Sequence, residues 1–93
     1  MPLLFEWDRE KAQGNFAKHG VSFDEASTAF RDTLSITIGD PLHSHGEDRF
    51  VLMGRSCQNR LLVVVHTKRG GRIRIISARQ ATRKERLGYE EGP

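Results

Sequence analysis

The side chains best suited to chemistry are the arginines and lysines in the second half of the chain. Residues 49–93 hold eleven basic and three acidic side chains, a net charge of +8, whereas residues 1–48 hold four basic and nine acidic ones, a net of −5. Arginine stays charged at physiological pH, and its planar guanidinium matches phosphate oxygens. The basic half could therefore bind a phosphate backbone, although an arginine-rich exterior that only keeps the protein in solution would have the same composition.

Few side chains could transfer a proton. Glu47 lies in a polar loop, His66 in an apolar strand and His19 at the end of an expected helix. A carboxylate or imidazole within reach of a reacting hydroxyl can act as a general base. Each also has an ordinary structural role: a salt bridge for Glu47, a packed ring for His66 and a charge at a helix C-terminus for His19.

Composition narrows the class of protein. The 93 residues leave room for one domain, residues 1–93, and 29% charged with 37% hydrophobic residues favours a folded globule. A single cysteine, Cys57, excludes an intrachain disulfide, and His43 and His45 lack an evident third ligand, so we predict no metal and no cofactor. The longest uncharged apolar run covers five residues, 61–65, far short of the ~20 that span a bilayer, and no signal peptide is visible. We therefore expect a cytoplasmic protein.

The pattern of apolar and turn residues predicts an α+β domain with the order β-α-α-β-β-β-β-α and an antiparallel sheet. Asp8 and Gly20 would bound a helix over 9–19, and Ser22 with Glu25 and Thr82 with Glu85 form capping-box patterns for a second helix and for a last helix over 83–90. The expected strands cover 3–7, 34–38, 50–56, 61–68 and 73–79.

Two short turns would set the register of the last three strands. If Gln58-Asn59 and Gly70-Gly71 are both two-residue turns, His66 lies opposite Val51 and Ile75. One face then carries Arg49, Arg55, His66, Lys68 and Arg79 around an apolar centre. A change of one residue in either turn would exchange the two faces. An apolar sheet with basic ends suits RNA, but it also suits charges that simply reach into water.

Two long motifs stand near the ends of the chain. The first comprises Phe5-Glu6-Trp7-Asp8, Lys11, Asn15, Lys18-His19-Gly20-Val21, Phe23 and Glu25-Ala26, and the second Ile73-Arg74-Ile75-Ile76-Ser77-Ala78-Arg79, Ala81-Thr82, Lys84-Glu85-Arg86 and Tyr89. Between them Asp40, Glu47, Arg49 and Gly54 fit the same pattern. Over nearly the whole chain these residues resemble the BrnT family of type II toxins.

This resemblance implies a RelE-like fold, in which helices pack on a small sheet. It also implies a metal-independent endoribonuclease that inhibits translation by cleaving RNA. The implied partner is a BrnA-like antitoxin with a ribbon-helix-helix domain, and operator DNA would be bound only by the toxin–antitoxin complex.

A metal-independent ribonuclease needs a base, an acid and positive charge for the phosphorane. We therefore expect a catalytic set of Arg79, Arg49, Glu47 and His66, with Arg79 first unless it is a structural partner of a glutamate on the last helix. The expected RNA contacts are Lys18, His19, Lys68, Arg74, Arg83, Lys84 and Tyr89, of which the tyrosine could instead be a core aromatic. The alternatives are a non-catalytic basic module that docks an acidic protein or nucleic acid, and a metal-dependent nuclease that uses the loop histidines.

Overall fold

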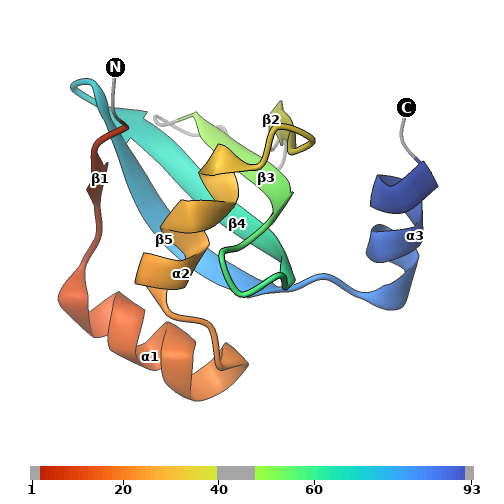
Figure 1. Cartoon of the computed structure of the whole chain (residues 1–93). Helices are drawn as coiled ribbons and strands as arrows, with labels where there is room; N and C mark the ends of the chain where they lie inside the picture. The colour runs from red at the N-terminus through yellow and green to blue at the C-terminus, as the bar shows by residue number, and fades with distance from the viewer. Residues whose placement is uncertain (1–2, 40–47, 92–93) are drawn as a thin grey trace.

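The computed structural model describes residues 3–39 and 48–91, and its order of helices and strands is the predicted one. The elements are β1 (Phe5–Glu6), α1 (Arg9–His19), α2 (Phe23–Thr28), the 3-10 turn η1 (Ala29–Arg31), β2 (Ile36–Gly39), β3 (Arg49–Arg55), β4 (Leu61–Arg69), β5 (Arg72–Gln80) and α3 (Arg83–Glu91). In Figure 1, α1 and α2 lie on one side of the sheet and α3 stands apart from them. None of the described helices is long and apolar enough to cross a bilayer.

The sheet is mixed, so the prediction of an antiparallel sheet was wrong for one strand pair. Its strand order is β1-β5-β4-β3-β2, and β1 pairs with β5 in parallel, with Phe5 beside Ile73 and Glu6 beside Arg74. The other three pairs are antiparallel. Turn residues predict only how strands that are adjacent in the sequence pair with each other. β1 and β5 lie near opposite ends of the sequence, so no turn between them indicates their pairing.

The predicted helix ends form, with one difference at α2. At α1 the Asp8 carboxylate accepts from the Lys11 N–H at 2.9 Å, and Gly20 takes a left-handed φ of 68°. At α2 the Ser22 hydroxyl accepts from the Glu25 N–H at 3.0 Å. The Glu25 carboxylate does not return to Ser22, because it is buried and bonded elsewhere, so only half of this capping box exists.

The core lies between the sheet and the first two helices. Its buried members are Val21, Phe23, Ala26, Leu62, Val64, Ile75 and Ala78. Asn15 ties α1 to the edge of β5 beyond the short β1: its amide nitrogen donates to the Ala78 carbonyl at 2.8 Å, and its oxygen accepts from the Ala78 N–H at 3.0 Å. This amide takes the place of a strand at an otherwise open edge. We call this side of the sheet the helix side and the opposite side the outer face.

The turn between β3 and β4 is one residue longer than predicted, which shifts their register. Ser56 donates its N–H to the Arg60 carbonyl at 2.9 Å, and Asn59 has a φ of 62°, so three residues form the loop. Val65, rather than His66, therefore lies opposite Val51. The predicted sharing of a face by His66 and Arg49 was wrong for this reason.

The turn between β4 and β5 has the predicted two residues. Gly70 and Gly71 have φ values of 52° and 82°, and His66 lies opposite Ile75 as expected. A bulge next to Val65 then shifts the rest of the ladder, so Arg79 lies opposite Val63 rather than Leu62. The bulge therefore leaves Ile75 and His66 on the helix side and Arg79 on the outer face.

Candidate functional site

Four arginines gather on the outer face. Arg49 and Arg74 both lie opposite Thr67, while Arg55 lies opposite Leu61 and Arg79 opposite Val63. Directly opposed residues share a face, and Thr67 and Val63 are separated by about 13 Å along β4. The arginines thus form two basic pairs at the two ends of this face. The apolar side chains of Val51, Met53, Val63 and Val65 lie between them.

Arg79 forms a two-pronged ion pair with Glu85. Its Nη1 donates to Oε1 at 2.8 Å and its Nη2 to Oε2 at 3.0 Å. These hydrogen bonds are the main reason why the pKa of Glu85 is lowered from 4.5 to about 2, and they raise the pKa of Arg79. Both groups stay ionised at physiological pH, and Glu85 is too weakly basic to take a proton there. Its carboxylate instead holds the guanidinium in one orientation.

Polar contacts hold α3 against the outer face. The Arg79–Glu85 ion pair joins the first turn of α3 to β5. A capping box orders that turn: the Thr82 N–H donates to the Glu85 carboxylate at 2.9 Å, and the Glu85 N–H donates to the Thr82 hydroxyl at 3.2 Å. Tyr89 donates its hydroxyl to Asp32, and the Arg55 guanidinium lies 5.8 Å from the centre of the tyrosine ring. Arg55 also pairs with a carboxylate near the end of α3 at 3.6 Å. No residue of α3 is buried, so these contacts, rather than a core, attach the helix.

The structure does not bring His66 to the arginines. The residue is 3% exposed and its ring lies on the helix side, with its centroid 4.8 Å from that of the Phe30 ring and 5.8 Å from that of the Phe50 ring. Its Nδ1 lies 3.3 Å from the Val64 carbonyl oxygen, and burial lowers its pKa. The sheet separates this imidazole from Arg79. Glu47 and the loop histidines lie outside the described residues.

The expected RNA contacts are divided between several surfaces. Arg74 is on the outer face, where its Nη1 donates to Glu6 at 2.9 Å. Arg83 and Lys84 are exposed in the first turn of α3. Lys68 lies on the helix side, with its ammonium 5.7 Å from the centre of the Phe50 ring, and Lys18 and His19 end α1. Tyr89 has the structural role of bonding Asp32. Across residues 3–39 and 48–91, no three side chains are grouped as a metal would require.

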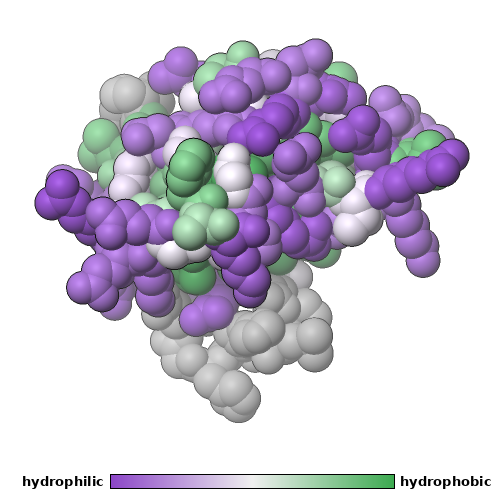
Figure 2. Space-filling view, turned by 90° about the horizontal axis from the view of Figure 1, so that it is seen from below, coloured by the Kyte–Doolittle hydropathy of each residue, from purple (hydrophilic) through white to green (hydrophobic). Residues whose placement is uncertain are grey.

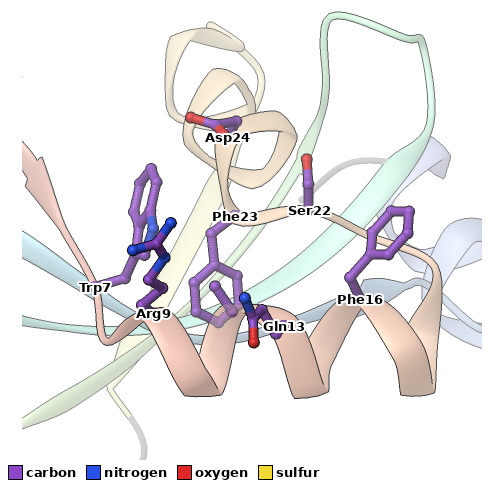
Figure 3. A pocket seen from close by; sticks show the side chains of 8 residues that line it. Trp7, Arg9, Gln13, Phe16, Ser22, Phe23 and Asp24 are labelled. Carbon is purple, nitrogen blue, oxygen red and sulfur yellow. The ribbon is translucent and has the colours of Figure 1, made fainter.

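A hollow of about 380 Å³ lies along α3, lined by Ala81, Arg83, Arg86 and Leu87. Two other hollows lie near these surfaces. The first, about 390 Å³, opens on the helix side between α1 and the start of α2. Figure 3 shows Trp7 and Arg9 at one end, Phe16 at the other and Phe23 with Gln13 between them. It faces away from the four arginines.

The second hollow, about 260 Å³, lies on the outer face between β2, β3 and α3. Its lining is Ile36, Ile38, Val51, Met53, Glu85, Gly88 and Tyr89. Sequence reasoning missed it, although the alternating isoleucines of β2 were a signal. From below, polar and charged residues cover most of the molecule and apolar residues form only small separate areas (Figure 2).

Comparison with known proteins connects this geometry to a function. A family model described as the ribonuclease toxin BrnT of type II toxin–antitoxin systems matches residues 7–85. The crystal structure of the ribonuclease toxin BrnT from Brucella abortus is similar in fold, with a TM-score of 0.64 and 22% sequence identity over 88% of this chain and 100% of that chain. No curated protein sequence matches the chain.

Proposed function

Because the chain belongs to the BrnT family of ribonuclease toxins of type II toxin–antitoxin systems, we propose that it is a metal-independent endoribonuclease that inhibits translation by cleaving RNA. The observation that carries this proposal is the outer face, where four arginines surround an apolar centre. RNA supplies both phosphates for guanidinium groups and flat bases for an apolar surface.

The proposed reaction is attack of a ribose 2′-hydroxyl on the adjacent phosphorus. A base takes the hydroxyl proton, the 2′-oxygen bonds to phosphorus, and the bond from phosphorus to the 5′-oxygen breaks as an acid protonates that oxygen. Arg79 stabilises the negative charge that builds on the phosphorane. Glu85 accepts one N–H from each Nη atom and the Gln80 carbonyl accepts the other from Nη1, so within the described part of the chain the Nε–H and the second N–H of Nη2 have no partner and remain as donors.

Glu47 and Arg49 complete the proposed catalytic set. Glu47 precedes Arg49 by two residues, and Arg49 begins β3 on the outer face. We assign Glu47 the role of general base and Arg49 that of a second charge on the phosphate. His66 has no part in this set, because it is buried on the other side of the sheet.

Arg74, Arg83 and Lys84 are the proposed phosphate contacts beyond the reacting group. Contacts to four to six phosphates of a single strand give a slope of log K against log salt of about −3 to −4. Filter binding of RNA across a salt series measures this slope. A flat response would show that the basic surface meets something other than a phosphate backbone.

The decisive experiment is inducible expression of the chain with and without the neighbouring open reading frame, scored for growth and RNA integrity. The purified chain is then incubated with RNA in the presence of a chelator. Cleavage that persists in chelator supports the proposal. Binding without cleavage would indicate the non-catalytic basic module, and cleavage lost in chelator would indicate a metal enzyme that uses His43 and His45.

The family implies an antitoxin, and we propose that it is a BrnA-like protein with a ribbon-helix-helix domain. An acidic or amphipathic segment of this partner would cover the arginines and exclude RNA, with complementary charge speeding its association. Co-expression should yield a stable complex in which cleavage is suppressed and operator DNA is bound. If the chain alone bound one DNA sequence tightly in high salt, this view of the partner would be wrong.

A further inference from the structure

The edge strand β2 exposes an apolar surface. It ends the sheet order, all four of its residues are exposed, and Ile36 and Ile38 keep 41% and 60% of their surface accessible. In the part of the chain that the structure describes, no strand pairs with the side of β2 turned away from β3. Such an edge presents unpaired backbone N–H and C=O groups to any extended segment that approaches it.

The same strand lines the apolar hollow of the outer face. Ile36 and Ile38 lie opposite Met53 and Val51, so all four side chains are on one face, and together they form most of the hollow's wall. The remaining wall comes from α3. An extended segment added to β2 would bond through its backbone, and every second side chain would point to this face. One apolar side chain of the segment would then enter the hollow.

The charge beside β2 decides what kind of chain fits. Arg49 and Arg55 stand at the two ends of the neighbouring strand β3, on the same face as the hollow. A second copy of this chain would bring its own arginines against them and be repelled. A segment with acidic side chains on either side of an apolar one would instead place carboxylates near both guanidinium groups.

We propose that the edge of β2 and its hollow form the docking surface for an extended, acidic and apolar segment of the antitoxin, which adds a sixth strand to the sheet. The inference rests on the proposed function, since the type II system supplies the partner. The added strand lies about 4.8 Å from β2, and its acidic side chains reach Arg49 and Arg55 on β3, two of the four arginines of the outer face. Docking at this edge therefore covers one side of the proposed RNA site.

The test compares two charge substitutions at exposed apolar positions. Ile38→Asp removes the apolar contact at β2 and repels an acidic segment, whereas Phe16→Asp makes the same change on α1, where the side chain is 58% exposed on the other side of the molecule. Calorimetric titration with the antitoxin encoded beside the chain should show affinity about tenfold to a hundredfold weaker for Ile38→Asp. The Phe16→Asp affinity should remain within about twofold of wild type.

Hydrogen exchange supplies an independent readout. Amides of residues 36–39 should exchange more slowly in the complex than in the free chain. Ile38→Ser, which adds no charge, should weaken binding in the same direction if the aspartate variant fails to fold. The free Ile38→Asp chain should still cleave RNA, although more slowly than wild type, because Ile38 lies beside Val51 on the face proposed to hold RNA and the new carboxylate repels phosphates.

Three results would overturn the docking surface: wild-type affinity in Ile38→Asp, equal weakening in Phe16→Asp, or unchanged exchange at residues 36–39. A dimer of the chain alone that Ile38→Asp dissociates would assign the edge to a second copy and also overturn it. Each result leaves the proposed function standing if RNA is still cleaved and the antitoxin still suppresses cleavage. A wild-type chain that neither cleaves RNA nor binds the antitoxin would defeat both proposals.

Discussion

Replacing Arg79 by alanine should lower the rate of RNA cleavage strongly and the stability of the fold only slightly. The change removes two hydrogen bonds to Glu85, and the two side chains are 41% and 30% exposed. The lowered pKa of Glu85 alone would suggest a larger effect, but solvent screening reduces the contribution of so exposed a pair to about 1 kcal/mol. Small domains are stable by about 5–15 kcal/mol, so the variant folds.

The expected effect on catalysis is much larger than the effect on folding. Removing one donor that stabilises developing charge lowers the rate by about 10²–10³, whereas 1 kcal/mol lowers the melting temperature of a domain this size by about 4–8 °C. Single-turnover cleavage of RNA at 25 °C, with melting followed by circular dichroism, measures both. A folded Arg79→Ala chain that cleaves at the wild-type rate would remove Arg79 from the site.

Glu85→Gln is the matched control, because it weakens the same ion pair and leaves the guanidinium in place. Its melting temperature should fall about as far as that of Arg79→Ala, while cleavage stays within a few-fold of wild type. The pKa of Glu85 is lower in the folded state, so its stabilising effect is complete above about pH 4.5 and disappears as the pH falls toward 2. As the pH falls through this range, wild type should therefore lose more stability than Glu85→Gln. If Arg79→Ala and Glu85→Gln lost cleavage activity equally, the proposed catalytic role of the Arg79 charge would be refuted.

Three further predictions concern the fold. Gly54→Ala places a Cβ 2.8 Å from a backbone oxygen of η1 and should lower the unfolding free energy, measured by urea titration, by about 1–3 kcal/mol. Gly14→Ala is the control: its Cβ would meet open space, so this variant should be as stable as wild type or more stable. Arg60→Ala leaves the buried Glu25 carboxylate without its guanidinium partner. The unfolding free energy should fall by about 3 kcal/mol, and the Glu25 pKa followed by NMR should rise. A fall in unfolding free energy of less than about 0.5 kcal/mol would contradict this prediction. Burial lowers the pKa of His66, so the unfolded chain binds a proton there more readily than the folded chain, and the unfolding free energy should fall from pH 7 to pH 5. His66→Gln should reduce this pH dependence. If the dependence were the same in His66→Gln as in wild type, it would not arise from His66.

The helices, strands and turns could be predicted because the residues that start and end them are close together in the sequence. Asp8 and Gly20 bound α1 where a cap and a left-handed residue were expected, and Gly70 with Gly71 forms the expected turn. Apart from the second helix, for which only the start was predicted, the predicted boundaries differ from the observed ones by no more than two residues. These features depend on backbone preferences of a few adjacent residues, which the sequence displays directly.

The register could not be predicted because two small irregularities control it. Asn59 adopts a positive φ and adds a third residue to one turn, and a bulge beside Val65 shifts part of the next ladder. Either conformation changes which side of the sheet a side chain occupies. The placement of His66 among the arginines failed for this reason, while Arg49, Arg55 and Arg79 share a face as expected.

The position of Arg79 on the outer face is compatible both with a role in catalysis and with an ion pair to the last helix. The helix side buries its side chains against α1 and α2, and even its histidine is desolvated there. At the outer face, α3 buries no residue and is attached by the ion pair of Arg79 with Glu85 and the hydrogen bond of Tyr89 with Asp32. A guanidinium that pairs with a carboxylate in a two-pronged geometry is also shaped for a phosphate. The ion pair with Glu85 therefore does not exclude Arg79 from catalysis: it keeps the group ionised, oriented and near the surface that RNA would reach.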